Sequence, residues 1–215
     1  MSPISNDLEV AVSPHEDLPP LSAKTTFCAG LLIRVTGALL QLSGKAVAFP
    51  TGPHPDRRGP IETRLAESIA DLQAALEIFL KTLPIPAESL TARRFAKLNT
   101  FRRWGLSGLA LLADPPVVHW QGLGKLIEET GELMELLSLL CTPACPGEAY
   151  LPPEIMQHFI EEIGDVQAAM DYVIEANHLP VAHIQQRRQQ SCGEYEDFVS
   201  ASRSAPAHSM EEIPS

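Results

Sequence analysis

Acidic residues recur at helical spacing in two stretches of this 215-residue chain. The stretch KLIEETGELMEL carries Glu129 and Glu132 three positions apart, within a run of leucine, isoleucine and methionine. The stretch IEEIGDVQAAM carries Glu162 and Asp165 at the same spacing. Residues three apart lie on one face of a helix, so each stretch predicts a helix that presents two carboxylates together.

Each acidic pair lies on a row beside the main apolar stripe of its predicted helix, and apolar residues continue that row. Such a row is expected to be partly buried. Four carboxylates that meet there do not all stay ionised without a cation, because burial and mutual repulsion both disfavour their charge. Ligand sets made only of oxygen favour Mg²⁺ or Mn²⁺. The predicted metal ligands are Glu129, Glu132, Glu162 and Asp165.

Iron and zinc are the competing metals for a helical protein with acids and cysteines. Di-iron carboxylate sites usually contain Glu-x-x-His motifs, whereas positions 132 and 165 hold Glu and Asp. The four cysteines include no CxxC pair, and a zinc site at the Cys141–Cys145 loop would need two further ligands. The sequence therefore favours Mg²⁺.

The chain repeats itself at an offset of 94 residues. GLLIRVTGALLQL, which begins at Gly30, matches GKLIEETGELMEL at seven of thirteen positions. ESIADLQAAL, which begins at Glu67, matches EEIGDVQAAM at six of ten positions. Because both matches share one offset, the connecting segments have equal length. The sequence therefore predicts two copies of a helical module of about 80 residues, each of which buries its apolar face against the other.

The first copy has lost most of the acidic row. At the four predicted ligand positions it reads, in order, Val35, Ala38, Ser68 and Asp71. A row that faces water should change to other polar residues, whereas a buried row that has lost its ligand should become apolar. The valine and the alanine indicate an interior row. Position 128 differs, because Arg34 stands opposite Glu128 and indicates a water-facing or supporting place.

The elements that must position these acids are predicted to be helices throughout, because no stretch alternates apolar and polar residues over a sustained length. The fold class is therefore all-α, with the tandem copies forming one pseudo-twofold helical bundle. The predicted helices cover about 24–43, 61–82, 87–103, 119–140, 154–177 and 181–198. The predicted divisions are a disordered arm (1–22), the degenerate copy (23–104), a linker (105–118), the copy with the intact acidic motif (119–199) and a disordered tail (200–215).

Charge and hydropathy limit the partners. The formal net charge is -11, so a nucleic acid is not an expected partner. No apolar stretch is expected to reach the roughly 20 residues of a membrane span. The opening MSPISNDLEV lacks the basic start and apolar run of a signal peptide. We therefore expect a cytoplasmic protein without a membrane partner.

The E-x-x-E pair of Glu129 and Glu132, followed about thirty residues later by the E-x-x-D pair, resembles the all-α nucleoside triphosphate pyrophosphatases. These are the MazG-like proteins, with dimeric dUTPases and phosphoribosyl-ATP pyrophosphatases as relatives. The resemblance covers 119–198 well and 24–104 weakly. It implies two MazG-like modules that hydrolyse (d)NTPs to (d)NMPs and pyrophosphate, cleaning the nucleotide pool, with Mg²⁺ held on the triphosphate by the four acids. Glu128 or Glu161 is the candidate acceptor of the water proton.

A basic and aromatic cluster, ARRFAKLNTFRRWG, resembles the tail after the last helix of many MazG-like proteins. The phosphates of the substrate need cations. We expect them to come from Lys97, Asn99, Arg102 and Arg103, with Trp104 near the base. His119 and Trp120 open the acidic helix where a base would stack. A solvated helix end accounts for the cluster equally well, and core packing accounts for His119 and Trp120.

Other functions fit the same residues. The substrate is alternatively dUTP, as in a dUTPase-like enzyme, or a modified nucleotide. A catalytically decayed copy would make the chain a nucleotide-binding regulator. A helical adaptor would leave the acids facing solvent, and it would bind no Mg²⁺. The expected partner is a nucleoside triphosphate, and a homodimer of chains would restore the larger assemblies of the family.

Overall fold

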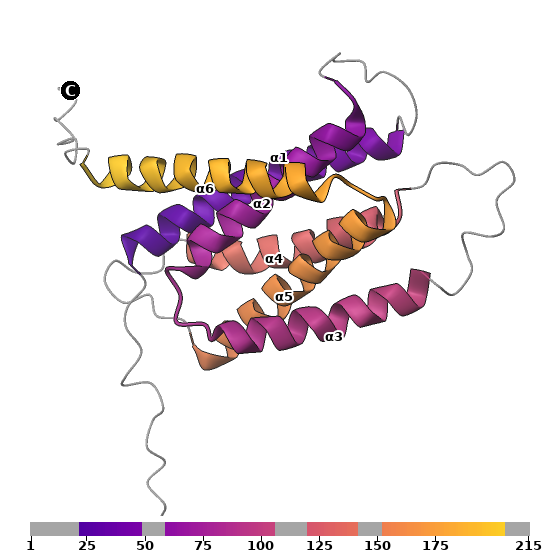
Figure 1. Cartoon of the computed structure of the whole chain (residues 1–215). Coiled ribbons are helices and arrows are strands. Elements are labelled where there is room, and N and C mark those ends of the chain that lie inside the picture. The colour runs from indigo at the N-terminus through magenta and orange to yellow at the C-terminus, as the bar shows by residue number, and fades with distance from the viewer. Residues whose placement is uncertain (1–21, 49–58, 106–119, 142–151, 205–215) are drawn as a thin grey trace, which may run out of the picture.

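A computed structural model describes residues 22–48, 59–105, 120–141 and 152–204 (Figure 1). Within these ranges the chain forms six α-helices and no strand, so the predicted all-α class is confirmed. The predicted linker, apart from Gly105, lies outside the described residues, as do the predicted arm before Ser22 and the tail after Ser204.

The helices lie where the sequence places them. They are α1 (Ala23–Ala48), α2 (Ile61–Leu80), α3 (Ala87–Gly105), α4 (Leu123–Cys141), α5 (Pro153–Ala176) and α6 (Val181–Ser204). Three boundaries differ from the prediction by more than two residues. Helix α4 begins at Leu123, four residues after the predicted start at 119. Helix α1 continues to Ala48 through GKAVA, which the sequence had placed in a loop, and α6 continues to Ser204, so the first residues of the predicted disordered tail are helical.

The ends of α5 show how the sequence sets the acidic helices in place. Pro153 occupies the first turn, where its missing N–H is not needed, and Glu154 beside it suits the positive end of the helix dipole. At the other end, the side-chain amide of Asn177 donates to the carbonyl oxygens of Val173 (2.8 Å) and Gln121 (2.9 Å). Its carbonyl accepts from the Gln121 N–H at 3.0 Å. Asn177 thus joins the end of α5 to the start of α4.

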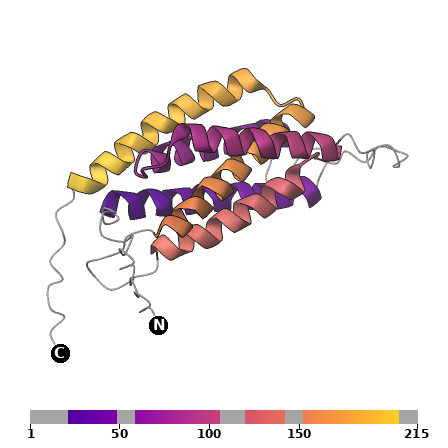
Figure 2. The ribbon, with the colours of Figure 1, turned by 90° about the horizontal axis from the view of Figure 1, so that it is seen from below.

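The third helix of each half packs on the second helix of the other half. Helix α3 lies along α5, and α6 lies along α2 (Figure 1). Helices α1 and α4 contact each other directly, and the view from below shows them side by side (Figure 2). The acidic helices α4 and α5 therefore share their surroundings with α3, which comes from the first half of the chain.

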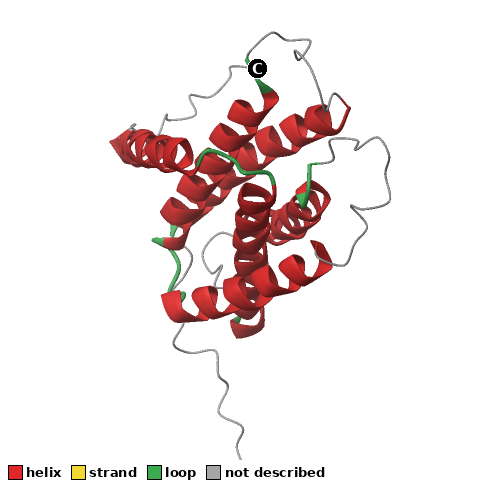
Figure 3. Ribbon diagram, turned by 45° about the vertical axis from the view of Figure 1, so that its right-hand side comes forward, coloured by secondary structure: helices red, strands yellow, loops and turns green. Residues whose placement is uncertain are grey.

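One core runs through both halves. Most of its largest buried side chains come from α1, α2, α4 and α5, and α3 adds Phe101. Phe79 of α2 meets Phe159 of α5 with ring centroids 5.9 Å apart. Helices α3 and α6 contribute fewer residues to this core, among them Phe101 of α3 and Val199 of α6. Figure 3 shows the same helices and the loops that join them from another side. Ion pairs also join α3 to α5 and α6 to α2, as Arg94 with Asp171 and Arg188 with Glu77 show.

Helix α1 corrects one expectation from the sequence. By length and composition it is apolar enough to cross a membrane, contrary to the prediction that no segment would be. Half of its most apolar window is buried inside the protein, where Cys28, Leu32 and Leu39 are fully enclosed. A core helix of a globular protein meets the same criterion, because burial in protein and in lipid select the same residues.

Candidate metal centre

Three of the four predicted ligands converge between α4 and α5. Glu129 and Glu132 come from successive turns of α4, and Glu162 comes from the facing side of α5. Each offers a carboxylate oxygen, and these oxygens all lie within 4.8 Å of one another. We call these three residues the acidic cluster. Oxygens this close together could all contact one central ion, because Mg²⁺ and Ca²⁺ bind oxygen ligands at about 2.0–2.6 Å.

Burial decreases across the acidic cluster, from one deeply buried member to one on the surface. Glu129 is 1% exposed, Glu162 is half-buried and Glu132 is exposed. The Oε2 atoms of Glu129 and Glu162 are buried and accept no hydrogen bond from any described residue. Burying an acceptor without a partner costs about 1–3 kcal/mol, and more for a charged group. A divalent cation would satisfy both oxygens, so the donor set fits the predicted metal.

The raised pKa of Glu162 reflects its burial close to the other carboxylates. Burial, followed by the neighbouring charges of Glu132, Asp165 and Glu129, raises the pKa of Glu162 to about 7. Near neutral pH the Glu162 carboxyl is therefore protonated in some molecules and ionised in the others. A bound cation would favour the charged form and would displace the proton.

The structure places the fourth predicted ligand, Asp165, outside the acidic cluster. Arg93 of α3 donates from Nε and Nη2 to its two oxygens at 2.6 and 2.7 Å, and Lys97 also donates to Oδ2. Asp165 is 2% exposed, so these cations neutralise a buried charge. Lys97 reaches Glu129 as well, at 3.3 Å, and Lys125 lies 3.1 Å from the same oxygen. Lys97 therefore bridges the aspartate and the acidic cluster.

Gly164 allows α3 to approach this closely. A Cβ added at Gly164 would lie 2.6 Å from Cγ and 2.9 Å from Cβ of Arg93. Neither Gly164 nor Arg93 is among the site residues predicted from the sequence. A signal for Arg93 was nevertheless present, because the pair Arg93-Arg94 aligns with Arg187-Arg188 at the offset of 94.

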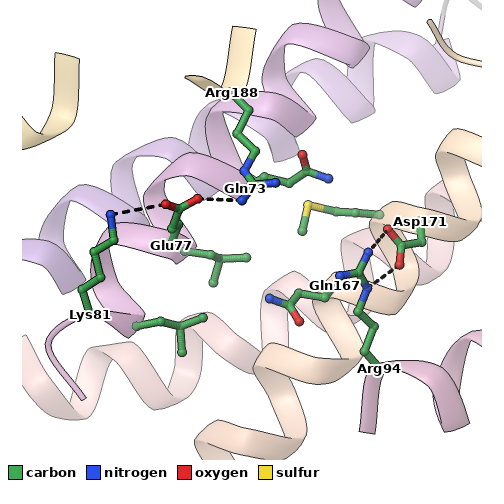
Figure 4. A pocket seen from close by; sticks show the side chains of 10 residues that line it. Gln73, Glu77, Lys81, Arg94, Gln167, Asp171 and Arg188 are labelled. Carbon is green, nitrogen blue, oxygen red and sulfur yellow. Dashed lines mark hydrogen bonds and ion pairs between the residues drawn. The ribbon is translucent and has the colours of Figure 1, made fainter. Parts of the chain in front are cut away.

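Ion pairs between the halves recur at that offset. Arg187 donates to Asp71 at 2.8 and 3.4 Å, as Arg93 does to Asp165. Arg188 likewise donates to Glu77 at 2.6 Å. The equivalent pair, Arg94 with Asp171, lies across a cavity of about 400 Å³ between α2 and α5 (Figure 4).

The predicted proton acceptors lie outside the acidic cluster. Glu128 has 54% of its side chain exposed and pairs with Lys125 at 2.6 Å, in agreement with the water-facing place inferred for it. Glu161 accepts a hydrogen bond from Gln157 at 2.9 Å. Each is the chain neighbour of a clustered glutamate.

The predicted substrate-binding residues divide into two groups. Lys97 lies at the acids, and Trp104, which is 55% exposed, is next to them, because Lys125 Nζ lies 5.7 Å from its ring. Arg102 instead pairs with Glu175 on α5. Asn99 accepts hydrogen bonds within its own helix, from Arg102 at its side-chain oxygen and from Arg103 at its backbone carbonyl. Trp120 packs against the core, and its buried indole N–H has no hydrogen-bond partner among the described residues. His119 lies outside the described residues.

The arrangement brings three carboxylates together, with two lysines at their edge. Carboxylates would hold a divalent ion, and Lys97 and Lys125 would meet an anionic ligand that shares the ion. Comparisons with protein-family models, with curated proteins and with solved structures found no match to this chain. The functional assignment therefore depends on the geometry of these residues.

Proposed function

We propose that the chain is a Mg²⁺-dependent nucleoside triphosphate pyrophosphohydrolase of the MazG-like type, which converts a (d)NTP and water to a (d)NMP and pyrophosphate. The observation that carries the proposal is the pair of buried, unpartnered carboxylate oxygens of Glu129 and Glu162 beside Glu132. Burying carboxylate oxygens without a partner is costly, and a bound divalent ion would offset that cost.

The chain's own residues have distinct parts in this proposal. Glu129, Glu132 and Glu162 hold the ion, which when bound neutralises phosphate charge and lowers the pKa of a water molecule. Lys97 and Lys125 fix Glu129 from two sides and present positive charge to the phosphates. Glu128 and Glu161 are the proton acceptors, and the exposed ring of Trp104 offers a face to the base.

We further infer that the two halves are related by a pseudo-twofold axis, as expected for tandem MazG-like modules. The recurring arginine–carboxylate pairs support this inference, and so does the exchange of third helices. One more ion pair occurs at aligned positions of the two halves, but with the positive and negative residues exchanged. Lys81 meets Glu196 at 2.9 Å, whereas the aligned positions hold Glu175 and Arg102.

A nucleotide-binding regulator without turnover is the second candidate. The engagement of Asp165 by Arg93 and Lys97 favours it, because an aspartate held by two cations is less available to a metal ion. A dUTPase-like preference is a narrower form of the first proposal. The cytoplasmic location and the homodimer remain predictions.

A substrate panel separates these candidates. The purified chain is incubated with each dNTP, with dUTP and with the NTPs in Mg²⁺, and pyrophosphate release is measured. We expect turnover that EDTA abolishes. Replacing Glu129 or Glu162 by glutamine should lower it at least about 100-fold, whereas Glu135→Gln, an exposed glutamate of the same helix, should leave it unchanged.

Each outcome of the substrate panel and of the variants bears on one of the candidate functions. Mg²⁺-dependent nucleotide binding without pyrophosphate would favour the regulator. Full turnover in Glu129→Gln would refute the metal assignment. Turnover confined to dUTP would give the dUTPase-like enzyme.

A further inference from the structure

The first half of the chain contains a hollow at the place that corresponds to the acidic cluster. Two cavities of about 450 Å³ and about 290 Å³ lie against α1, α2 and α6 and share Ala38, Ser68 and Asp71. At the offset of 94 these three positions align with two clustered acids and the buried aspartate of the second half. We call the two cavities together the first-half pocket.

Cations dominate the lining of the first-half pocket. Its charged residues are Arg34, Lys45, Arg64 and Arg187 against Glu67 and Asp71. The positions aligned with Arg34, Lys45 and Arg64 hold Glu128, Leu139 and His158. Loss of a metal site alone would leave apolar or uncharged residues. Here acids have disappeared and cations have been gained, so the sign of the site is reversed.

The two carboxylates of the pocket are already engaged on its α6 side. Asp71 accepts from Arg187 at 2.8 Å and from the Ser191 hydroxyl at 2.6 Å. Glu67 lies 3.3 Å from His183 Nε2. Both carboxylates of the lining thus have partners on α6, and the lining as a whole contains four cationic groups against two carboxylates, a formal excess of positive charge.

Hydroxyl groups and a ring complete the lining. Burial and then the charge of Asp71 raise the pKa of Tyr195 to about 12, so its phenol keeps its proton near neutral pH. The phenol and the Ser68 hydroxyl belong to the smaller cavity, together with the apolar wall of Val35. Neutral hydroxyl donors beside guanidinium groups are the usual partners of phosphate oxygens.

We propose that the first-half pocket binds the phosphate groups of a small anion without a metal ion. The larger cavity has room for a ligand of nucleotide size, since ligand pockets usually measure about 300–1,000 Å³. The phosphate comes either from inorganic pyrophosphate or from a nucleotide. The site is separate from the acidic cluster, and its binding does not require turnover there.

Calorimetry in EDTA tests this directly. Pyrophosphate, orthophosphate and a nucleoside monophosphate are titrated separately into the full chain at moderate salt. We expect one anion to bind per chain, and Lys45→Gln, Arg64→Gln and Ser68→Glu should each weaken it about tenfold or more. Tighter binding of pyrophosphate or of the monophosphate identifies the source, and either result supports the proposal.

Two control variants keep the test specific. Lys24→Glu changes a cation of α1 that does not line the pocket, and it should leave the affinity unchanged. Glu129→Gln, which removes turnover if the proposed function is correct, should also leave this metal-free binding intact. The proposal is overturned if no anion binds in EDTA while the unfolding transition shows an intact fold. Equal weakening by Lys24→Glu would overturn it too, because only net charge would then matter.

Discussion

Replacing Glu162 by glutamine removes one charge from the acidic cluster and should stabilise the metal-free protein at alkaline pH. The pKa of Glu162 lies near 7 instead of 4.5. A group whose pKa is raised on folding stabilises the native state below its unfolded pKa and loses that contribution as pH rises through the folded pKa. The window for this residue therefore runs from about pH 4.5 to about pH 7, with the full loss reached above it.

The magnitude follows from the size of the shift. Each pKa unit corresponds to about 1.4 kcal/mol, so the upper bound is about 3 kcal/mol at pH 8. Glu162 is only half-buried, and solvent screening reduces this to about 1–2 kcal/mol. The variant should gain that amount in free energy of unfolding relative to wild type between pH 5 and pH 8. For a chain of this length the gain corresponds to about 2–8 °C in Tm at pH 8.

The assay is urea unfolding in EDTA at pH 5, 6, 7 and 8, followed by circular dichroism. Glu135→Gln is the matched control, because it makes the same change at an exposed position of α4, and its stability difference from wild type should not vary with pH. Adding Mg²⁺ should stabilise wild type at pH 8 and Glu162→Gln much less. If wild type and Glu162→Gln show the same pH dependence, the carboxylates do not repel one another and the reasoning fails.

Three further predictions concern the same region. Gly164→Ala should destabilise the protein by about 1–3 kcal/mol because its Cβ meets Arg93, whereas Gly131→Ala, with open space around it, should be neutral or slightly stabilising in thermal unfolding. Arg93→Ala should cost about 1–3 kcal/mol in urea unfolding, since Lys97 alone then holds the buried Asp165; an unchanged midpoint would contradict the ion pair. Mg²⁺ affinity, measured by calorimetry, should rise severalfold from about pH 6 to pH 8 as the proton on Glu162 ceases to compete, and a flat profile would contradict the raised pKa.

The sequence could predict what depends on the period of a helix. The six helices and the pairing of Glu129 with Glu132 on one face follow from residues three or four apart. The approach of Glu162 was expected because its row occupies the same angular place on the other acidic helix. The partner of Asp165 does not follow from such rows. Arg93 reaches it only because α3 crosses to α5, and that packing depends on contacts between distant segments.

The same reason explains the mixed result for the basic cluster. Lys97 and Arg102 lie on one helix, and their spacing alone says nothing of which residues of α5 they meet. In the fold Lys97 reaches the acids, whereas Arg102 is paired with Glu175 further along α5. The glycine in GKAVA predicts a helix end at about residue 43, but α1 continues through it to Ala48.

Because α3 packs on α5 and α6 packs on α2, each half of the chain depends on a helix of the other half. Two of the cations that hold Asp165 and Glu129, Arg93 and Lys97, belong to α3, which precedes the acidic half in the chain. A fragment that begins after α3 would contain every clustered acid and Lys125, but it would lack Lys97, which pairs with Glu129, and Arg93, which pairs with Asp165. Two fragments produced in one cell would have to find each other to rebuild the site. Substitution in the first half is therefore constrained along α3, because a change at Arg93 or Lys97 would remove ion pairs of the second half.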